Sequence, residues 1–109
     1  MHAVEITPRE LARQLENGHA VQMIDVRQPW ESAIAQLPGS VLIPLGDLPR
    51  RVDEIPREPG VMVVLYCHHG VRSLSAVSYL RRLGHELVLS LAGGIDAWSC
   101  EVDPAVPRY

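Results

Sequence analysis

The sequence has 109 residues, the size of one domain with one hydrophobic core, and we expect a single domain over residues 1–109. Its net charge of -3 gives no basis for binding nucleic acid or an anionic membrane surface, so neither is expected as a partner. All of the basic residues are arginine, which excludes Schiff-base chemistry on a lysine.

The cysteines and the N-terminal residues indicate a compartment. Cys67 and Cys100 are too few for a disulfide framework or a cysteine-rich zinc site. No basic stretch followed by an apolar run opens the sequence, and no apolar stretch approaches the ~20 residues of a membrane span. We therefore expect a cytoplasmic location, where a cysteine stays reduced.

In the first half of the chain, short helices and strands alternate. Thr7 is predicted to cap a helix with Pro8 at its first position and Glu10 completing a capping box. The next element is a predicted strand over residues 21–26. Further expected elements are a short helix beginning at 29, a strand over 41–43 and a helix over 45–55.

In the second half, residues 61–66 form the clearest predicted strand. They are continuously apolar and rich in β-branched residues, as in a strand buried on both faces of a parallel sheet. The other expected elements are a helix over 73–83, a strand over 86–89, a helix after Gly93-Gly94 through 98, and a surface tail from 103. Alternating strands and helices predict an α/β fold with a mainly parallel sheet.

Cys67 lies between the strand over 61–66 and the following helix. In open α/β sheets, ligands bind at the carboxyl ends of the strands. The amides of a tight strand-to-helix turn and the positive helix end favour an anion, and they stabilise a thiolate. Gly70 permits a backbone geometry that a side chain would block, and Arg72 adds a charged fork suited to an oxyanion. We interpret Cys67 as a reactive thiol, the alternative being a buried core cysteine.

Four segments together resemble the rhodanese family of sulfurtransferases, its single-domain bacterial members above all. Residues 24–31 are similar to the family's "DVR…E" segment, 37–45 to "IPGA…IPL", 67–73 to the cysteine loop and 91–98 to "GG…W". Members often carry histidine before the Pro-Gly turn, as in "GHIPGA", where this chain has Ala35-Gln36-Leu37-Pro38-Gly39-Ser40. We interpret this departure as a local change at the rim of the site.

The resemblance implies a mainly parallel central sheet with helices on both faces, and a ping-pong sulfur transfer. Cys67 attacks a donor such as thiosulfate, and the resulting persulfide passes its sulfur to cyanide or a thiol. The active-site loop is formed by His68, His69, Gly70, Val71 and Arg72. Arg72 either holds the sulfonate of the donor or steadies the loop. No metal or organic cofactor is required, and a protein partner in a sulfur relay is compatible with the same chemistry.

Other polar and aromatic residues have more than one interpretation. Asp25 and Arg27 either brace the loop or form a structural ion pair, which we favour. His68 and His69 are expected at the pocket mouth, as a proton relay or a donor-binding pair, because no further metal ligand has suitable spacing. The remaining expectations place His2, His19 and His85 at the surface, Trp98 in the core, Trp30 near the pocket or over a helix, and Cys100 on another face.

Two rival functions remain open. A phosphatase or arsenate reductase of the same fold has five residues between its cysteine and arginine, whereas four separate Cys67 from Arg72. A shorter ring of amides suits one sulfur atom better than a tetrahedral phosphate. A non-catalytic regulatory module would be expected to lack Cys67, which is present here.

Overall fold

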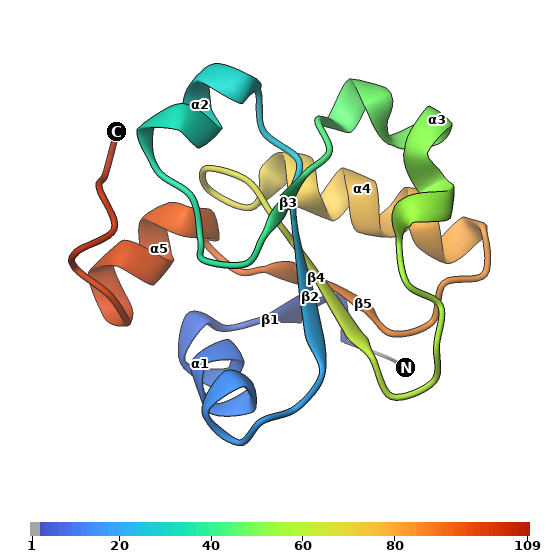
Figure 1. Ribbon diagram of the computed structural model, residues 1–109, viewed down its shortest axis with the longest axis horizontal. Coiled ribbons are helices and arrows are strands. Elements are labelled where there is room, and N and C mark those ends of the chain that lie inside the picture. The colour runs from blue at the N-terminus through green and yellow to red at the C-terminus, as the bar shows by residue number, and fades with distance from the viewer. Residues whose placement is uncertain (1–2) are drawn as a thin grey trace.

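The computed structural model describes residues 3–109 and contains one five-stranded sheet (Figure 1). The strands are β1 (Glu5–Ile6), β2 (Val21–Asp25), β3 (Val41–Leu42), β4 (Met62–Tyr66) and β5 (Val88–Leu91). Their spatial order is β1-β5-β4-β2-β3, and every neighbouring pair is parallel. The predicted α/β fold with a parallel sheet is confirmed, and β4 lies at its centre.

Helices cover both faces of the sheet, as the resemblance implied (Figure 1). They are α1 (Pro8–Glu16), α2 (Pro29–Ile34), α3 (Leu48–Arg51), α4 (Val71–Arg82) and α5 (Gly94–Glu101), with 3₁₀ turns at Leu45–Asp47 and Val52–Glu54. Helices α3 and α4 pack on one face, and α1 and α5 pack on the other. No helix within residues 3–109 has both the length and the apolar character of a membrane span.

Strand β4 explains why its sequence is apolar without alternation. Successive side chains of a strand point to opposite faces. Val63 and Leu65 enter the core under α3 and α4, whereas Val64 and Tyr66 enter the core under α1 and α5. Cys67 continues this alternation on the α3 and α4 side. The buried strand therefore delivers the cysteine to the carboxyl edge of the sheet.

Several element boundaries differ from the prediction. The helix expected over 45–55 is divided into two 3₁₀ turns around a single turn of α-helix. Helix α4 begins at Val71 rather than Ser73, so the helix dipole starts closer to Cys67. Strand β5 lies two residues later than expected. Strand β1 was not predicted, because two residues are too few to display a period.

The tail after residue 103 does more than lie on the surface. Val106 is buried in the core beneath α5, together with Trp98, which confirms the core position expected for Trp98. The hydroxyl of Ser99 donates to the Val106 carbonyl at 2.9 Å. Beyond this packing the tail runs past α5 toward α2, where the hydroxyl of Tyr109 donates to Glu31 (Figure 1).

Candidate active site

The sulfur of Cys67 is buried but surrounded by polar groups. Cys67 is 1% exposed, and its side chain belongs to the core under α3 and α4. The sulfur nevertheless accepts the amide of Gly70 at 3.1 Å and that of Ser73 at 3.4 Å. The Ser73 hydroxyl also lies 3.4 Å from the sulfur, and 2.7 Å from the hydroxyl of Ser90 on β5. Donors thus converge on the sulfur despite its burial, in agreement with the interpretation of Cys67 as more than a packing residue.

Helix α5 fixes the direction of the loop amides. Its first amides, of Ile95 and Asp96, donate to the carbonyls of Cys67 and His68 at 2.9 and 3.2 Å. In a trans peptide the carbonyl and the amide point in opposite directions. The amides of His68 and His69 therefore point away from α5.

Two glycines permit this close approach. Gly94 has a φ of +65°, and a Cβ there would lie 2.3 Å from the carbonyl oxygen of His68. Gly70 has a φ of +100°, and a Cβ on it would lie 3.2 Å from the amide nitrogen of Gly93. Both positions favour glycine on conformation, and Gly94 requires it on space. Gly94 and Gly70 therefore allow α5 and the Cys67 loop to lie directly against each other.

Four further amides of the loop have no acceptor within residues 3–109. They belong to His68, His69, Val71 and Arg72. The last two lie in the first turn of α4, where amides have no partner inside the helix. They lie in the same loop as the amides of Gly70 and Ser73, which contact the sulfur, and at the positive end of α4.

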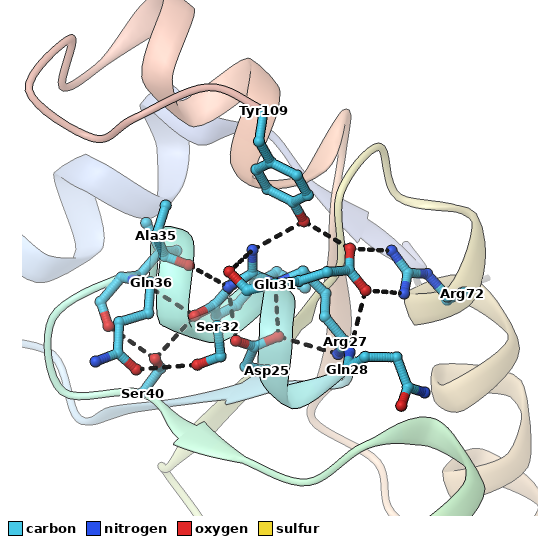
Figure 2. Close-up of polar contacts among 12 residues, drawn as sticks. Asp25, Arg27, Gln28, Glu31, Ser32, Ala35, Gln36, Ser40, Arg72 and Tyr109 are labelled. Carbon is cyan, nitrogen blue, oxygen red and sulfur yellow. Dashed lines mark hydrogen bonds and ion pairs between the residues drawn. The ribbon is translucent and has the colours of Figure 1, made fainter.

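Arg72 forms a bidentate ion pair with Glu31 of α2 (Figure 2). The two nitrogen–oxygen distances are 2.6 and 2.8 Å, and Glu31 is 3% exposed. The hydrogen bonds from Arg72 hold the pKa of Glu31 at about 2, so the carboxylate stays charged. The fork expected to bind an oxyanion is thus occupied, which favours the other expected role of Arg72, steadying the loop.

Asp25 and Arg27 form the structural ion pair favoured by the sequence. Both are fully buried, and Arg27 donates to the two carboxylate oxygens of Asp25 at 2.8 and 2.7 Å. Arg27 also donates to the carbonyl of Ala35 at 2.5 Å, which ties the pair to the end of α2 (Figure 2). Each charge is thus satisfied by the other within the buried pair.

His68 and His69 stack on each other, with ring centroids 3.9 Å apart. Their nitrogens and a carboxylate oxygen of Asp96 lie within 4.8 Å of one another, so the expectation that no third ligand approaches them was wrong. However, stacked imidazoles direct their lone pairs along separate planes rather than at one ion. Asp96 is also bound by Arg108 at 2.8 Å, which lowers the pKa of its carboxyl. Binding an ion here would therefore require the rings to turn and Arg108 to release Asp96.

Several residues of the site escaped the sequence analysis. Glu31 stands in the quoted "DVR…E" segment, so a signal for it existed, but its pairing with Arg72 joins residues 41 positions apart. Ser73, Ser90 and Tyr109 carried no signal, since a serine or a tyrosine alone indicates no particular chemistry.

Of the predictions for histidines outside the Cys67 loop, one is confirmed and one is wrong. His19 is exposed as expected, whereas His85 is buried and was wrongly placed at the surface; His2 lies outside the described residues. Trp30 is 62% exposed and makes an edge contact with Tyr109. Cys67 and Cys100 are both free thiols, Cys100 being exposed.

Known proteins resemble this chain in sequence and in fold. Residues 7–101 match the rhodanese-like domain family. A sulfurtransferase of Allochromatium vinosum is 38% identical over 95 residues, and the match covers 87% of each chain. MoeZ of Mycobacterium tuberculosis, a probable adenylyltransferase/sulfurtransferase, is 37% identical over 106 residues, which are 95% of this chain but 26% of MoeZ. A rhodanese-like domain protein from Staphylococcus aureus has a crystal structure that matches with a TM-score of 0.82, at 30% identity, over 96% of this chain and 97% of that one.

These matches confirm the resemblance drawn from the four sequence segments. The family match over residues 7–101 includes all four of these segments. The chain spans about a quarter of MoeZ, so the activity of that larger protein remains its own. By its sequence and its fold, the chain belongs to the rhodanese-like domain family.

Proposed function

We propose that this protein is a sulfurtransferase that carries sulfur as a persulfide on Cys67. The observation that carries the proposal is that the buried Cys67 sulfur accepts two amides of its loop, those of Gly70 and Ser73. Such donors stabilise negative charge on a thiolate and then on the outer sulfur of a persulfide. The sulfurtransferase relative from Allochromatium supports the same assignment.

In the proposed reaction, the Cys67 thiolate attacks the outer sulfur of thiosulfate. A sulfur–sulfur bond forms, the sulfur–sulfur bond of thiosulfate breaks, and sulfite leaves with the electron pair. An acceptor thiolate or cyanide then attacks the terminal sulfur of the persulfide and regenerates the Cys67 thiolate. The amides of His68, His69, Val71 and Arg72 have no acceptor within residues 3–109, which supports this scheme, because they are available to the outer sulfur and to the sulfonate of the donor.

The occupied fork of Arg72 argues against a phosphatase. Binding a phosphate dianion calls for a cation that is free to face it. Arg72 instead shares both of its terminal nitrogens with the Glu31 carboxylate, so the pair brings no net charge to the loop. The four-residue spacing from Cys67 points the same way.

Intact-mass measurement after incubation with thiosulfate tests the proposal. We expect one added sulfur on the wild type and on Cys100→Ser, and none on Cys67→Ser. Cyanide or a thiol should then remove the added sulfur. A wild type that gains no sulfur but hydrolyses an aryl phosphate would support the phosphatase instead, and inertness in both assays would support a binding module.

A further inference from the structure

Tyr109 joins two ion pairs that otherwise have no side chain in common (Figure 2). Its hydroxyl oxygen lies 2.9 Å from a guanidinium nitrogen of Arg27 and 2.7 Å from a carboxylate oxygen of Glu31. An arginine can only donate and a carboxylate only accept, so the hydroxyl proton goes to Glu31. Burial raises the pKa of Tyr109 to about 12, which keeps that proton in place.

The ring of Tyr109 makes a second set of contacts with the loop. It stacks on the imidazole of His68 at a centroid distance of 4.0 Å, with the two planes 8° apart. His69 lies on the same His68 ring at 3.9 Å. His68 is therefore stacked against both neighbours, and it is the residue that directly follows Cys67.

Tyr109 thus acts on both ends of the Cys67 loop. It contacts the first residue, His68, through its ring, and it reaches the last residue, Arg72, through the carboxylate of Glu31. Between these ends lies the amide of Gly70, and directly after Arg72 comes that of Ser73; both donate to the sulfur. A change in Tyr109 is therefore expected to alter the direction of these amides without touching the sulfur itself.

Tyr109 lies beyond residues 7–101, the part of the chain that matches the family. It reaches the site because the preceding tail is anchored under α5, where Val106 is buried. Arg108 adds a second tie, through Asp96 of α5. The segment after α5 is thus packed against the loop and α2 at several points.

On the proposed function, we infer that Tyr109 is a positioning residue for sulfur transfer, which sets both ends of the Cys67 loop through its hydroxyl and its ring. It touches neither the sulfur nor a reacting atom. The hydroxyl and the ring of Tyr109 contribute separately to the position of the loop. The hydroxyl orders Glu31 and Arg72, and the ring orders His68.

The test compares Tyr109→Phe, Tyr109→Leu and the matched control Tyr79→Phe. Tyr109→Phe removes the hydroxyl and keeps the ring, whereas Tyr109→Leu removes both. Tyr79 lies on α4 and packs against the core away from this network, so its hydroxyl serves as the control. For each variant we would measure the rate of sulfur loading from thiosulfate, well below the unfolding transition, and the amide NMR resonances of residues 68–73.

We expect Tyr109→Phe to load sulfur roughly tenfold more slowly than the wild type, the change that follows from losing one hydrogen bond to a charged group. Tyr109→Leu should be slower still, so that the retained ring gives a partial rescue. The amide resonances of the loop should shift in both variants and stay in place in Tyr79→Phe.

Loading by Tyr109→Phe within about twofold of the wild type, or loop resonances that do not move, would overturn the inference. If Tyr109→Leu does not fold, Tyr109→Phe decides alone. If the wild type itself gains no sulfur, the proposed function fails. The loop resonances of Tyr109→Phe then still decide whether Tyr109 positions the loop.

Discussion

The two ends of the sheet differ in what they offer to a ligand. At the carboxyl end, amides converge on the Cys67 sulfur, and the nearby charges of Arg27 and Arg72 are satisfied by carboxylates. At the opposite end, an open hollow of about 420 Å³ lies between the loop after Pro56 and the start of β5. His85 lines this hollow, and its buried Nε2 has no partner within residues 3–109.

The direction of hydrogen-bond donors, and not the volume of a cavity, distinguishes the end of the sheet that holds the candidate active site. The hollow is spacious, yet within the described chain it is lined by no cysteine, serine, threonine or lysine. The carboxyl end is tightly packed, but its peptide groups are aligned by α5 and by the start of α4. Substitutions at both ends should separate effects on activity from effects on stability.

The largest difference is expected between two glycine substitutions. In Gly94→Ala the new Cβ would meet the His68 carbonyl at 2.3 Å, so the loop must move or the domain must open. We expect a loss of about 3 kcal/mol in the free energy of unfolding, and sulfur loading should fall even where the protein is folded. Urea unfolding and the mass assay would measure the two effects.

Gly60→Ala is the matched control at the other end of the sheet. Gly60 also has a positive φ, of +88°, but a Cβ there meets nothing within 4 Å. We expect only the conformational cost, about 1 kcal/mol, and wild-type sulfur loading. Equal effects of the two substitutions on loading would contradict the role given to α5.

A smaller effect is expected from Glu31→Gln, which removes the charge that pairs with Arg72. The free energy of unfolding should fall by roughly 1–2 kcal/mol at neutral pH, less than for a fully buried pair because Arg72 is partly exposed. Sulfur loading should fall as well, since the end of the loop loses its anchor.

The pH dependence of the free energy of unfolding tests whether the Glu31 carboxylate causes the loss of stability in Glu31→Gln. Its pKa is about 2 in the folded chain and near its ordinary value of 4.5 in the unfolded chain. The contribution of Glu31 is therefore complete above about pH 4.5, and it is lost as the pH falls toward 2. The difference in stability between wild type and Glu31→Gln should shrink across this range. A difference that stays constant would exclude the ion pair as its source.

The smallest effect is expected at His85. Burial, with a further contribution from Arg57, lowers the pKa of His85, so the ring is neutral in the folded chain. Its contribution is present above pH ~6.5 and is lost as the pH falls through the folded pKa. His85→Leu should flatten the fall in stability below that pH, by about 1 kcal/mol or less, and leave sulfur loading unchanged. Slower sulfur loading by His85→Leu would contradict the conclusion that only the carboxyl end of the sheet takes part in sulfur transfer.

Much of the fold was predictable because the signals are local. The alternation of apolar strands with capped helices predicted the parallel sheet, and Thr7 indeed accepts the amide of Glu10 at 3.1 Å. The second half of the expected capping box is absent, since Glu10 bonds with Arg13 and Gln14 instead. The broken helix over 45–55 and the late start of β5 were not predictable, because packing sets such boundaries.

The candidate site was predictable in part. The position of Cys67 after a buried strand, the glycine at 70 and the ion pair of Asp25 with Arg27 followed from the order of the residues. The pairing of Arg72 with Glu31 was not predictable, because the sequence gives the charge of a residue but not which distant residue it contacts. Burial of His85 likewise depends on a cavity wall built from distant segments.

The sequence by itself determined the class of fold and the place of the sulfur, because hydrophobic periodicity and a strand–turn–helix order are properties of neighbouring residues. Only the tertiary structure decided the direction of the amides, the neutralisation of Arg72 and the return of Tyr109 to the loop. Each of these joins segments that are far apart in the chain, where the gain from a contact depends on what folding brings within hydrogen-bond distance.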